Sequence, residues 1–156
     1  MMHTRLLILL APLIYAAHIL EEAPGYMRWV NSLVEHPFPD QGHFFAGNLP
    51  SIVITALIAI AAAVTLNRGV LLVMLAWLSY FMFANAIFHI VATVYLRRYS
   101  PGAITSTVLY LPYFAWFWLY IRTRIPAWLA AAVVLISGLP MLIQGYRIVF
   151  LGTRFY

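Results

Sequence analysis

The sequence contains no cysteine and no lysine, and it has few charged residues of any kind. Without cysteine the chain can form neither disulfide bonds nor thiolate metal sites nor iron–sulfur clusters. Charged residues make up 8% of the 156 residues and hydrophobic residues 65%, whereas a soluble domain usually has about a quarter charged residues. So little charge could not cover a water-facing surface, and the composition therefore predicts a protein of the lipid bilayer.

The positive charge of the chain comes entirely from arginine. All nine basic residues are arginines, and the formal net charge is +5. In a soluble protein this balance would suggest a nucleic-acid partner. Here the arginines flank hydrophobic runs, as bilayer anchors and loop charges do. We therefore expect the bilayer as a partner and no nucleic acid.

Five hydrophobic runs are long enough to cross a bilayer, which takes roughly 17–25 residues. Their approximate limits are residues 6–23, 49–66, 70–96, 103–121 and 126–149. The predicted fold is all-α: a polytopic integral membrane helix bundle of about five transmembrane helices, with a longer loop after the first. The length suits one transmembrane domain, residues 1–156. Gly138 and Pro140 predict a kink in the last helix.

The first run contains three ionisable residues in the segment HILEE: His18, Glu21 and Glu22. Their spacing places them on one face of a helix. A charged group in hydrocarbon is costly unless it is paired, coordinated or hydrated, so such groups usually mark a functional site. The alternative is an ion pair with an arginine such as Arg147, the second glutamate being protonated.

A second polar stripe lies in the third run, where Asn85, His89 and Thr93 follow one another at intervals of four residues. This spacing puts them on one helix face. At 1.5 Å per residue, His18 and His89 lie about 9 and 12 Å before the ends of their helices. Both helices run in the same direction, so the two histidines are predicted at similar depth. His43, in the loop after the first run, is a possible further contributor.

The segments HILEE, NAIFH and HIVAT, followed by YSPG, resemble the HXXEE family of small integral membrane proteins. The named motifs of that family are HxxEE, NAxxH and HxxxT, and the last two share one histidine here. The residues that match them are His18, Glu21, Glu22, Asn85, Ala86, His89 and Thr93. The resemblance covers these motifs and the hydrophobic layout. It implies a membrane protein, expected to be an enzyme, and implies no particular reaction.

Two histidines and two carboxylates can bind Zn²⁺, Fe²⁺ or Mn²⁺. We predict His18, Glu21, Glu22 and His89 as ligands of a divalent metal ion, which would neutralise both glutamates. Glu21 would be the second carboxylate ligand or a general base. The predicted catalytic residues are Glu21, Asn85 and Thr93, with Asn85 polarising the substrate and Thr93 orienting its neighbour.

The sequence favours a membrane-embedded metal-dependent enzyme, a hydrolase or an oxidase, that acts on a lipid-like or hydrophobic substrate. A metal-bound water could attack an ester, amide or phosphoester, and redox-active iron could oxidise an acyl chain. One alternative is a metal-free proton-transfer isomerase that uses the same histidines and glutamates. Another is a non-enzymatic membrane or haem-binding subunit, in which these residues are structural or are axial ligands.

Overall fold

The computed structural model describes residues 2–37 and 41–153 of the chain, and these residues form helices and connecting turns without any strand. Five helical segments are long and apolar enough to cross a membrane: Met2–Glu22, Gln41–Thr65, Arg68–Leu96, Ala103–Ile121 and Ala127–Leu151. The predicted all-α bundle of five such helices is therefore confirmed.

Several of the five segments are divided by a change of helix type or by a break. Their elements, together with one short extra helix, are α1 (Met2–Leu9), α2 (Ala11–Glu22), α3 (Tyr26–Asn31), α4 (Gln41–Thr65), α5 (Arg68–Leu78), η1 (Ser79–Ala84), α6 (Asn85–Leu96), α7 (Ala103–Thr105), η2 (Ser106–Tyr110), α8 (Leu111–Ile121), α9 (Ala127–Tyr146) and η3 (Arg147–Leu151). Pro12 stands in the first turn of α2, where its missing N–H costs no helical hydrogen bond. The η elements are wider π-helical turns, which often lie at functional sites.

The second long helix begins well before the position expected from hydropathy. It starts at Gln41 instead of Leu49, so Asn48 and Pro50 lie inside it. The side chains of Asn48 and Ser51 donate hydrogen bonds of 2.9 Å to backbone carbonyls of the preceding turn. These bonds lie beside the proline, which itself lacks an N–H to donate. Asn48 and Pro50 are residue types that commonly lie at the start of a helix, and here both lie inside α4.

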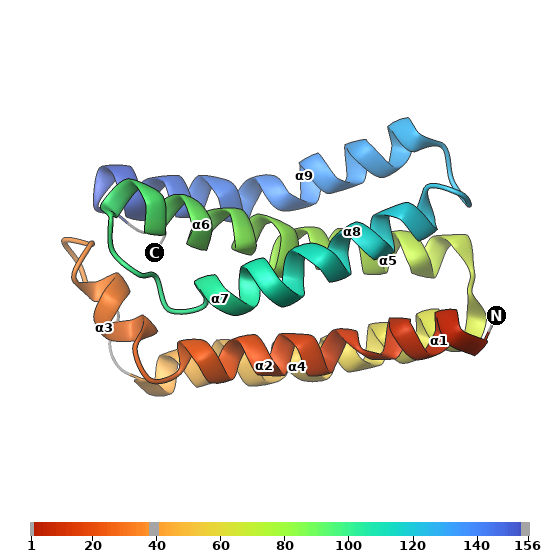
Figure 1. Ribbon diagram of the computed structural model, residues 1–156, viewed down its shortest axis with the longest axis horizontal. Coiled ribbons are helices and arrows are strands. Elements are labelled where there is room, and N and C mark those ends of the chain that lie inside the picture. Colours follow the sequence, from red (N-terminus) through yellow and green to blue (C-terminus); the bar gives the residue numbers. More distant parts are fainter. Residues whose placement is uncertain (1, 38–40, 154–156) are drawn as a thin grey trace.

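The long helices lie side by side along the longest axis of the molecule (Figure 1). α4 packs against α1, α2 and α5, while α9 packs against α5, η1 and α6. In Figure 1, α9 lies along one side of the bundle and α2 with α4 along the opposite side. One end of the bundle carries α3 and the turn formed by residues 97–102, and we call it the α3 end. Gly138 and Pro140 lie within α9, which runs uninterrupted through them.

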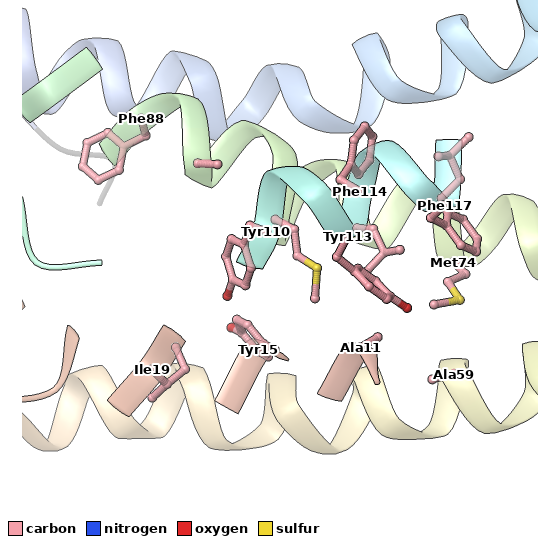
Figure 2. Packing of buried hydrophobic residues seen from close by; sticks show 14 of the residues in the cluster. Ala11, Tyr15, Ile19, Ala59, Met74, Phe88, Tyr110, Tyr113, Phe114 and Phe117 are labelled. Carbon is pink, nitrogen blue, oxygen red and sulfur yellow. The ribbon is translucent and has the colours of Figure 1, made fainter. Parts of the chain in front are cut away.

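Aromatic and aliphatic side chains fill the space between these helices (Figure 2). Tyr15 from α2 faces Tyr110 from η2, with ring centroids 6.5 Å apart. The outer surface is also apolar, and some of its side chains expose 66–74% of their area: Leu13, Leu20, Val94 and Ile136. Water-soluble proteins rarely expose large contiguous apolar patches. An apolar outer surface suits hydrocarbon surroundings.

Candidate metal centre

Three of the predicted site residues meet near the α3 end of the bundle. Glu22 Oε1 lies 3.6 Å from His18 Nε2, one helical turn away on α2, and 3.1 Å from His89 Nε2 on α6. The side chains of the three residues expose at most 6% of their area. One ligand atom from each lies within 4.8 Å of the others. We call these residues the His–Glu–His cluster.

Hydroxyl groups hold the far side of each imidazole ring. His18 Nδ1 lies 2.8 Å from Thr105 Oγ1, and His89 Nδ1 lies 2.9 Å from Ser100 Oγ. Thr105 directs its single hydroxyl proton to the carbonyl of Gly102, at 3.3 Å. In the tautomer that carries a proton on Nδ1, His18 donates a hydrogen bond to the Thr105 oxygen. This arrangement leaves His18 Nε2 with a lone pair directed at Glu22.

The interior of the cluster contains two imidazole Nε2 atoms without a hydrogen-bond partner among the described residues. Glu22 lies within ion-pair distance of His89, yet no described residue gives a hydrogen bond to Nε2 of His18 or of His89. Buried polar atoms without partners are costly, so a proton or a cation is needed between them. Ligands about 2.0–2.1 Å from a tetrahedral metal ion would lie roughly 3.3 Å apart. The observed distances of 3.1 and 3.6 Å bracket that separation.

The turn at residues 97–102 closes directly over the cluster. Gly102 has a φ of +101°, in the left-handed region that glycine adopts most easily. A Cβ atom at this position would lie 2.7 Å from Cε1 of His18 and 2.9 Å from Cε1 of His89. Both the backbone conformation and the close approach require glycine. The last residue of the YSPG segment therefore determines how closely the turn covers the two rings.

Glu21 points away from the cluster, toward the start of the fourth long helix. Its carboxylate accepts backbone N–H groups of Gly102, Ile104 and Thr105, at 3.2, 3.1 and 2.7 Å. It also accepts the hydroxyl of Tyr99. The N–H groups of a first helical turn lack partners within the helix, and an anion there is favourable. The structure thus places Glu21, predicted as a ligand and a catalytic residue, as the cap of α7.

Thr93 and Asn85 occupy different positions relative to the cluster. Thr93 Oγ1 accepts the backbone N–H of Ser100 at 3.2 Å, so it acts on His89 only through the turn. Asn85 lies one turn before His89 and lines a cavity, and its buried Oδ1 has no hydrogen-bond partner in the described part of the chain. Of the three predicted catalytic residues, Asn85 alone lines this cavity.

The cavity has a volume of about 360 Å³ and reaches His18 and Glu22. Its other lining residues come from α2, α3, α4, η1, α6 and α9: Tyr15, Ile19, Tyr26, Met27, His43, Phe44, Gly47, Asn48, Ser51, Tyr80, Phe81, Asn85, Met141 and Gln144. His43 is thus a wall residue. Arg147, the alternative ion-pair partner of the glutamates, donates from Nε to Thr153 at 3.4 Å.

Two tyrosines outside the five long apolar helical segments have perturbed acidity. Burial, with a smaller contribution from the nearby Glu22 carboxylate, raises the pKa of Tyr26. Burial, followed by the hydrogen bond to Glu21, raises the pKa of Tyr99 to about 12. Both phenols therefore keep their protons at neutral pH. Tyr26 lines the cavity as an uncharged side chain, and Tyr99 remains a hydrogen-bond donor to Glu21.

Sequence reasoning did not identify Ser100, Gly102, Thr105 or Tyr110 as parts of this centre. The Tyr110 ring lies 4.3 Å from that of His18, measured between centroids. The sequence does contain a signal for Ser100 and Gly102, because they belong to the YSPG turn between two hydrophobic runs. The sequence contains no such signal for Thr105 and Tyr110, because hydroxyl residues within an apolar run commonly form hydrogen bonds within their own helix.

Comparison with known proteins identifies a family that shares the motifs of this chain. A family model described as "Protein of unknown function with HXXEE motif" matches residues 9–117, which are more than half of the chain. The matched range contains the His–Glu–His cluster, the turn above it and both hydroxyl residues that hold the imidazole rings. No curated protein and no solved structure matches the chain.

Proposed function

The chain belongs to the HXXEE family, and we propose that it is a multi-pass membrane enzyme that uses one divalent metal ion on a hydrophobic substrate. The ion would be held by His18, Glu22 and His89. One observation carries this proposal: two imidazole Nε2 atoms that have no hydrogen-bond partner among the described residues converge with a carboxylate oxygen in a buried site. A cation between these atoms would satisfy all three.

The type and number of the metal-ligating side chains support a catalytic role for the ion. Two histidines and one carboxylate form the ligand set of several catalytic zinc sites, which keep a further position open for water or substrate. The same set with open positions also suits non-haem Fe²⁺. The cavity reaches His18 and Glu22, so an open position would face it. Zn²⁺ would lead to hydrolysis, and iron would lead to oxidation.

When bound, such an ion would activate water or polarise a carbonyl group. The residues of the chain would perform the other tasks. Ser100 and Thr105 hold the imidazole rings from behind. Asn85, one turn before His89, can bond a polar group of the substrate, because its buried amide oxygen has no partner in the described structure. The 97–102 turn, which Gly102 brings against both imidazole rings, would shield this side of the cluster from water.

The metal content of variants tests this proposal, with the neighbouring residues Glu22 and Glu21 as a matched pair. We expect the purified wild-type protein to contain one Zn or Fe per chain by elemental analysis, and we expect His18→Ala, Glu22→Gln and His89→Ala to lose it. Glu21→Gln should keep the metal, because Glu21 caps α7 and lies outside the cluster. Full metal content in the three cluster variants, or equal loss in Glu21→Gln, would contradict the assignment.

A second candidate function is metal-free proton transfer. It is favoured by the 3.1 Å distance between His89 Nε2 and Glu22 Oε1, across which a shared proton could lie. Paired groups of this kind can act as acid and base in an isomerase. Wild-type protein that contains no stoichiometric metal, and whose melting temperature does not change with chelator, would favour this second function over the first.

A further inference from the structure

The cavity that ends at Glu22 has two walls that do not pack closely on each other. One wall is α4, which contributes Gly47 and Ser51, and the other is α9, which contributes Met141 and Gln144. α4 packs against α1, α2 and α5, whereas α9 packs against α5, η1 and α6. Gly47 is exposed at the edge of the cavity. An entrance between α4 and α9 would face sideways, toward the surroundings of the helices.

The polar groups of the cavity wall are almost all uncharged. Among the described residues that line the cavity, Glu22 is the only carboxylate and none is an arginine. The amides and hydroxyls of the lining belong to Tyr15, Tyr26, Asn48, Ser51, Tyr80, Asn85 and Gln144. Proteins usually bind phosphate and carboxylate groups with arginine or lysine. The described lining of the cavity can form hydrogen bonds with a ligand but contains no arginine or lysine to bind an anionic group.

Arginines do lie at the same end of the bundle, but they serve other contacts. Arg28 donates to the carbonyl of Pro24 at 3.1 Å, and Arg98 donates to Ser32 Oγ at 2.7 Å. Neither lines the cavity. A divalent ion on Glu22 would leave one net positive charge at the inner end of the cavity. That charge suits a polarised carbonyl or hydroxyl group, and no arginine among the described lining residues could hold an anionic group.

The size and remaining lining of the cavity indicate which part of a substrate it would hold. Its volume of about 360 Å³ is at the small end of the range of about 300–1,000 Å³ for ligand pockets. Phe44, Phe81 and Met141 supply apolar surface beside the polar groups. A long-chain molecule would place its polar end inside and leave the rest of the chain between α4 and α9.

We propose that the cavity admits, from the side, a long-chain molecule whose polar end carries no charge, such as an alcohol, an ester or an amide. This inference rests on the proposed function, because it takes the His–Glu–His cluster as the reacting end of the cavity. Lateral entry lets the hydrocarbon chain remain in apolar surroundings, since moving it into water would cost about 0.8 kcal/mol for each CH₂ group.

The first test compares two probes of equal chain length, one ending in an uncharged hydroxyl group and the other in a carboxylate. The protein is placed in phosphatidylcholine nanodiscs and irradiated with a diazirine-labelled hexadecanol or with the matching hexadecanoic acid. We expect the alcohol to label peptides of α2, α4 and α9 at least about tenfold more than the acid, a preference of roughly 1.4 kcal/mol. Equal labelling, or stronger labelling by the acid, overturns the proposal.

The second test closes the entrance. A Cβ atom at Gly47 would meet nothing within 4 Å, so the ring in Gly47→Phe can occupy the cavity without moving the backbone. Ala46→Phe is the matched control, because Ala46 is exposed on the same helix and does not line the cavity. We expect Gly47→Phe to lower alcohol labelling about tenfold and Ala46→Phe to leave it unchanged. Equal labelling of the two variants overturns entry between α4 and α9.

Metal content, measured on the same samples, separates this inference from the proposed function. Full metal occupancy without selective labelling by the alcohol overturns the substrate class and leaves the metal site intact. Selective labelling of metal-free protein overturns the metal-dependent function and supports the cavity as the binding site for uncharged lipids. The comparison of the two probes on the wild-type protein requires no variant, so it remains decisive if Gly47→Phe fails to fold.

Discussion

Thr105 and Ser100 show how single hydroxyl groups prepare a histidine pair for binding. Each accepts or shares a proton with the Nδ1 atom of one ring, which leaves the Nε2 atom to face Glu22. Partners of this type orient metal-ligating histidines, and their loss typically lowers metal affinity about 10–100-fold. The chemistry of the site therefore depends on residues that lie behind its ligands.

We expect Thr105→Val to weaken Zn²⁺ binding by roughly 10–100-fold, because valine cannot accept the Nδ1 proton of His18. Competition with a chromogenic chelator measures the change. Thr107→Val is the matched control, since Thr107 bonds only the carbonyl of Ala103 in the described structure. Thr105→Ser should restore affinity. A serine variant as weak as the valine variant would contradict a role for the hydroxyl group.

Gly102→Ala should abolish metal binding, because the added methyl group would lie 2.7 Å from the His18 ring and 2.9 Å from the His89 ring. Gly152→Ala controls for backbone strain, since Gly152, far in sequence from the cluster, also has a positive φ, of +63°, and a Cβ atom there would lie 3.2 Å from the carbonyl oxygen of Leu33. Both variants should lose about 1–2 kcal/mol of stability. Metal analysis should detect a loss of bound metal in Gly102→Ala alone. An equal loss of metal in Gly152→Ala would show that backbone strain, and not the contact with the rings, causes the loss.

At the scale of the helix, α2 divides its two glutamates between two tasks. Successive residues of an α-helix point about 100° apart. Glu22 therefore joins His18 one turn away, while Glu21 faces the start of α7. A motif with three ionisable residues on one helix predicts a single cluster, but the adjacent helix N-terminus attracts one of them. The cap thus holds α2 against the fourth long helix, while the cluster holds it against α6 of the third.

The cap leads to a prediction about pH. The pKa of Tyr99 is raised from 10.0 to about 12. The protonated hydroxyl of Tyr99 therefore contributes fully to folding stability below pH 10, and this contribution is lost as the pH rises through 12. We expect wild-type protein to melt at a higher temperature than Tyr99→Phe below pH 10, and this difference to shrink toward pH 12. Tyr95→Phe, on exposed α6 surface, is the control for removal of a tyrosine hydroxyl. A constant difference for Tyr99→Phe would refute this linkage.

At the scale of the whole molecule, the His–Glu–His cluster joins α2 to α6 through groups that need a cation or a proton between them. A metal ion that binds only the folded protein stabilises it by about 2.7 kcal/mol when its free concentration is 100 times Kd. Chelator should therefore lower the melting temperature of the wild-type protein in detergent. Glu22→Gln should melt at the same temperature with and without chelator. An equal effect of chelator on both proteins would exclude the cluster as the binding site.

Much of the fold could be predicted from hydropathy, and the missing parts have physical causes. Five apolar segments predicted five helices, since a long apolar run has few other ways to satisfy its backbone. The start of α4 was misplaced, because Asn48 and Pro50 usually mark a helix terminus and here lie inside a helix. Hydropathy does not detect the short helix α3 or the π-helical turns either, because these depend on packing between segments.

The sequence by itself determined the apolar helices, the arginines at their ends and the two polar stripes that carry His18 and His89. These follow from composition and helical periodicity, which are local properties. Only the tertiary structure decided that Glu22 enters the cluster and that Glu21 caps α7. It also placed Ser100, Gly102 and Thr105 behind the histidines. Such contacts join residues far apart in the chain, and no local pattern specifies them.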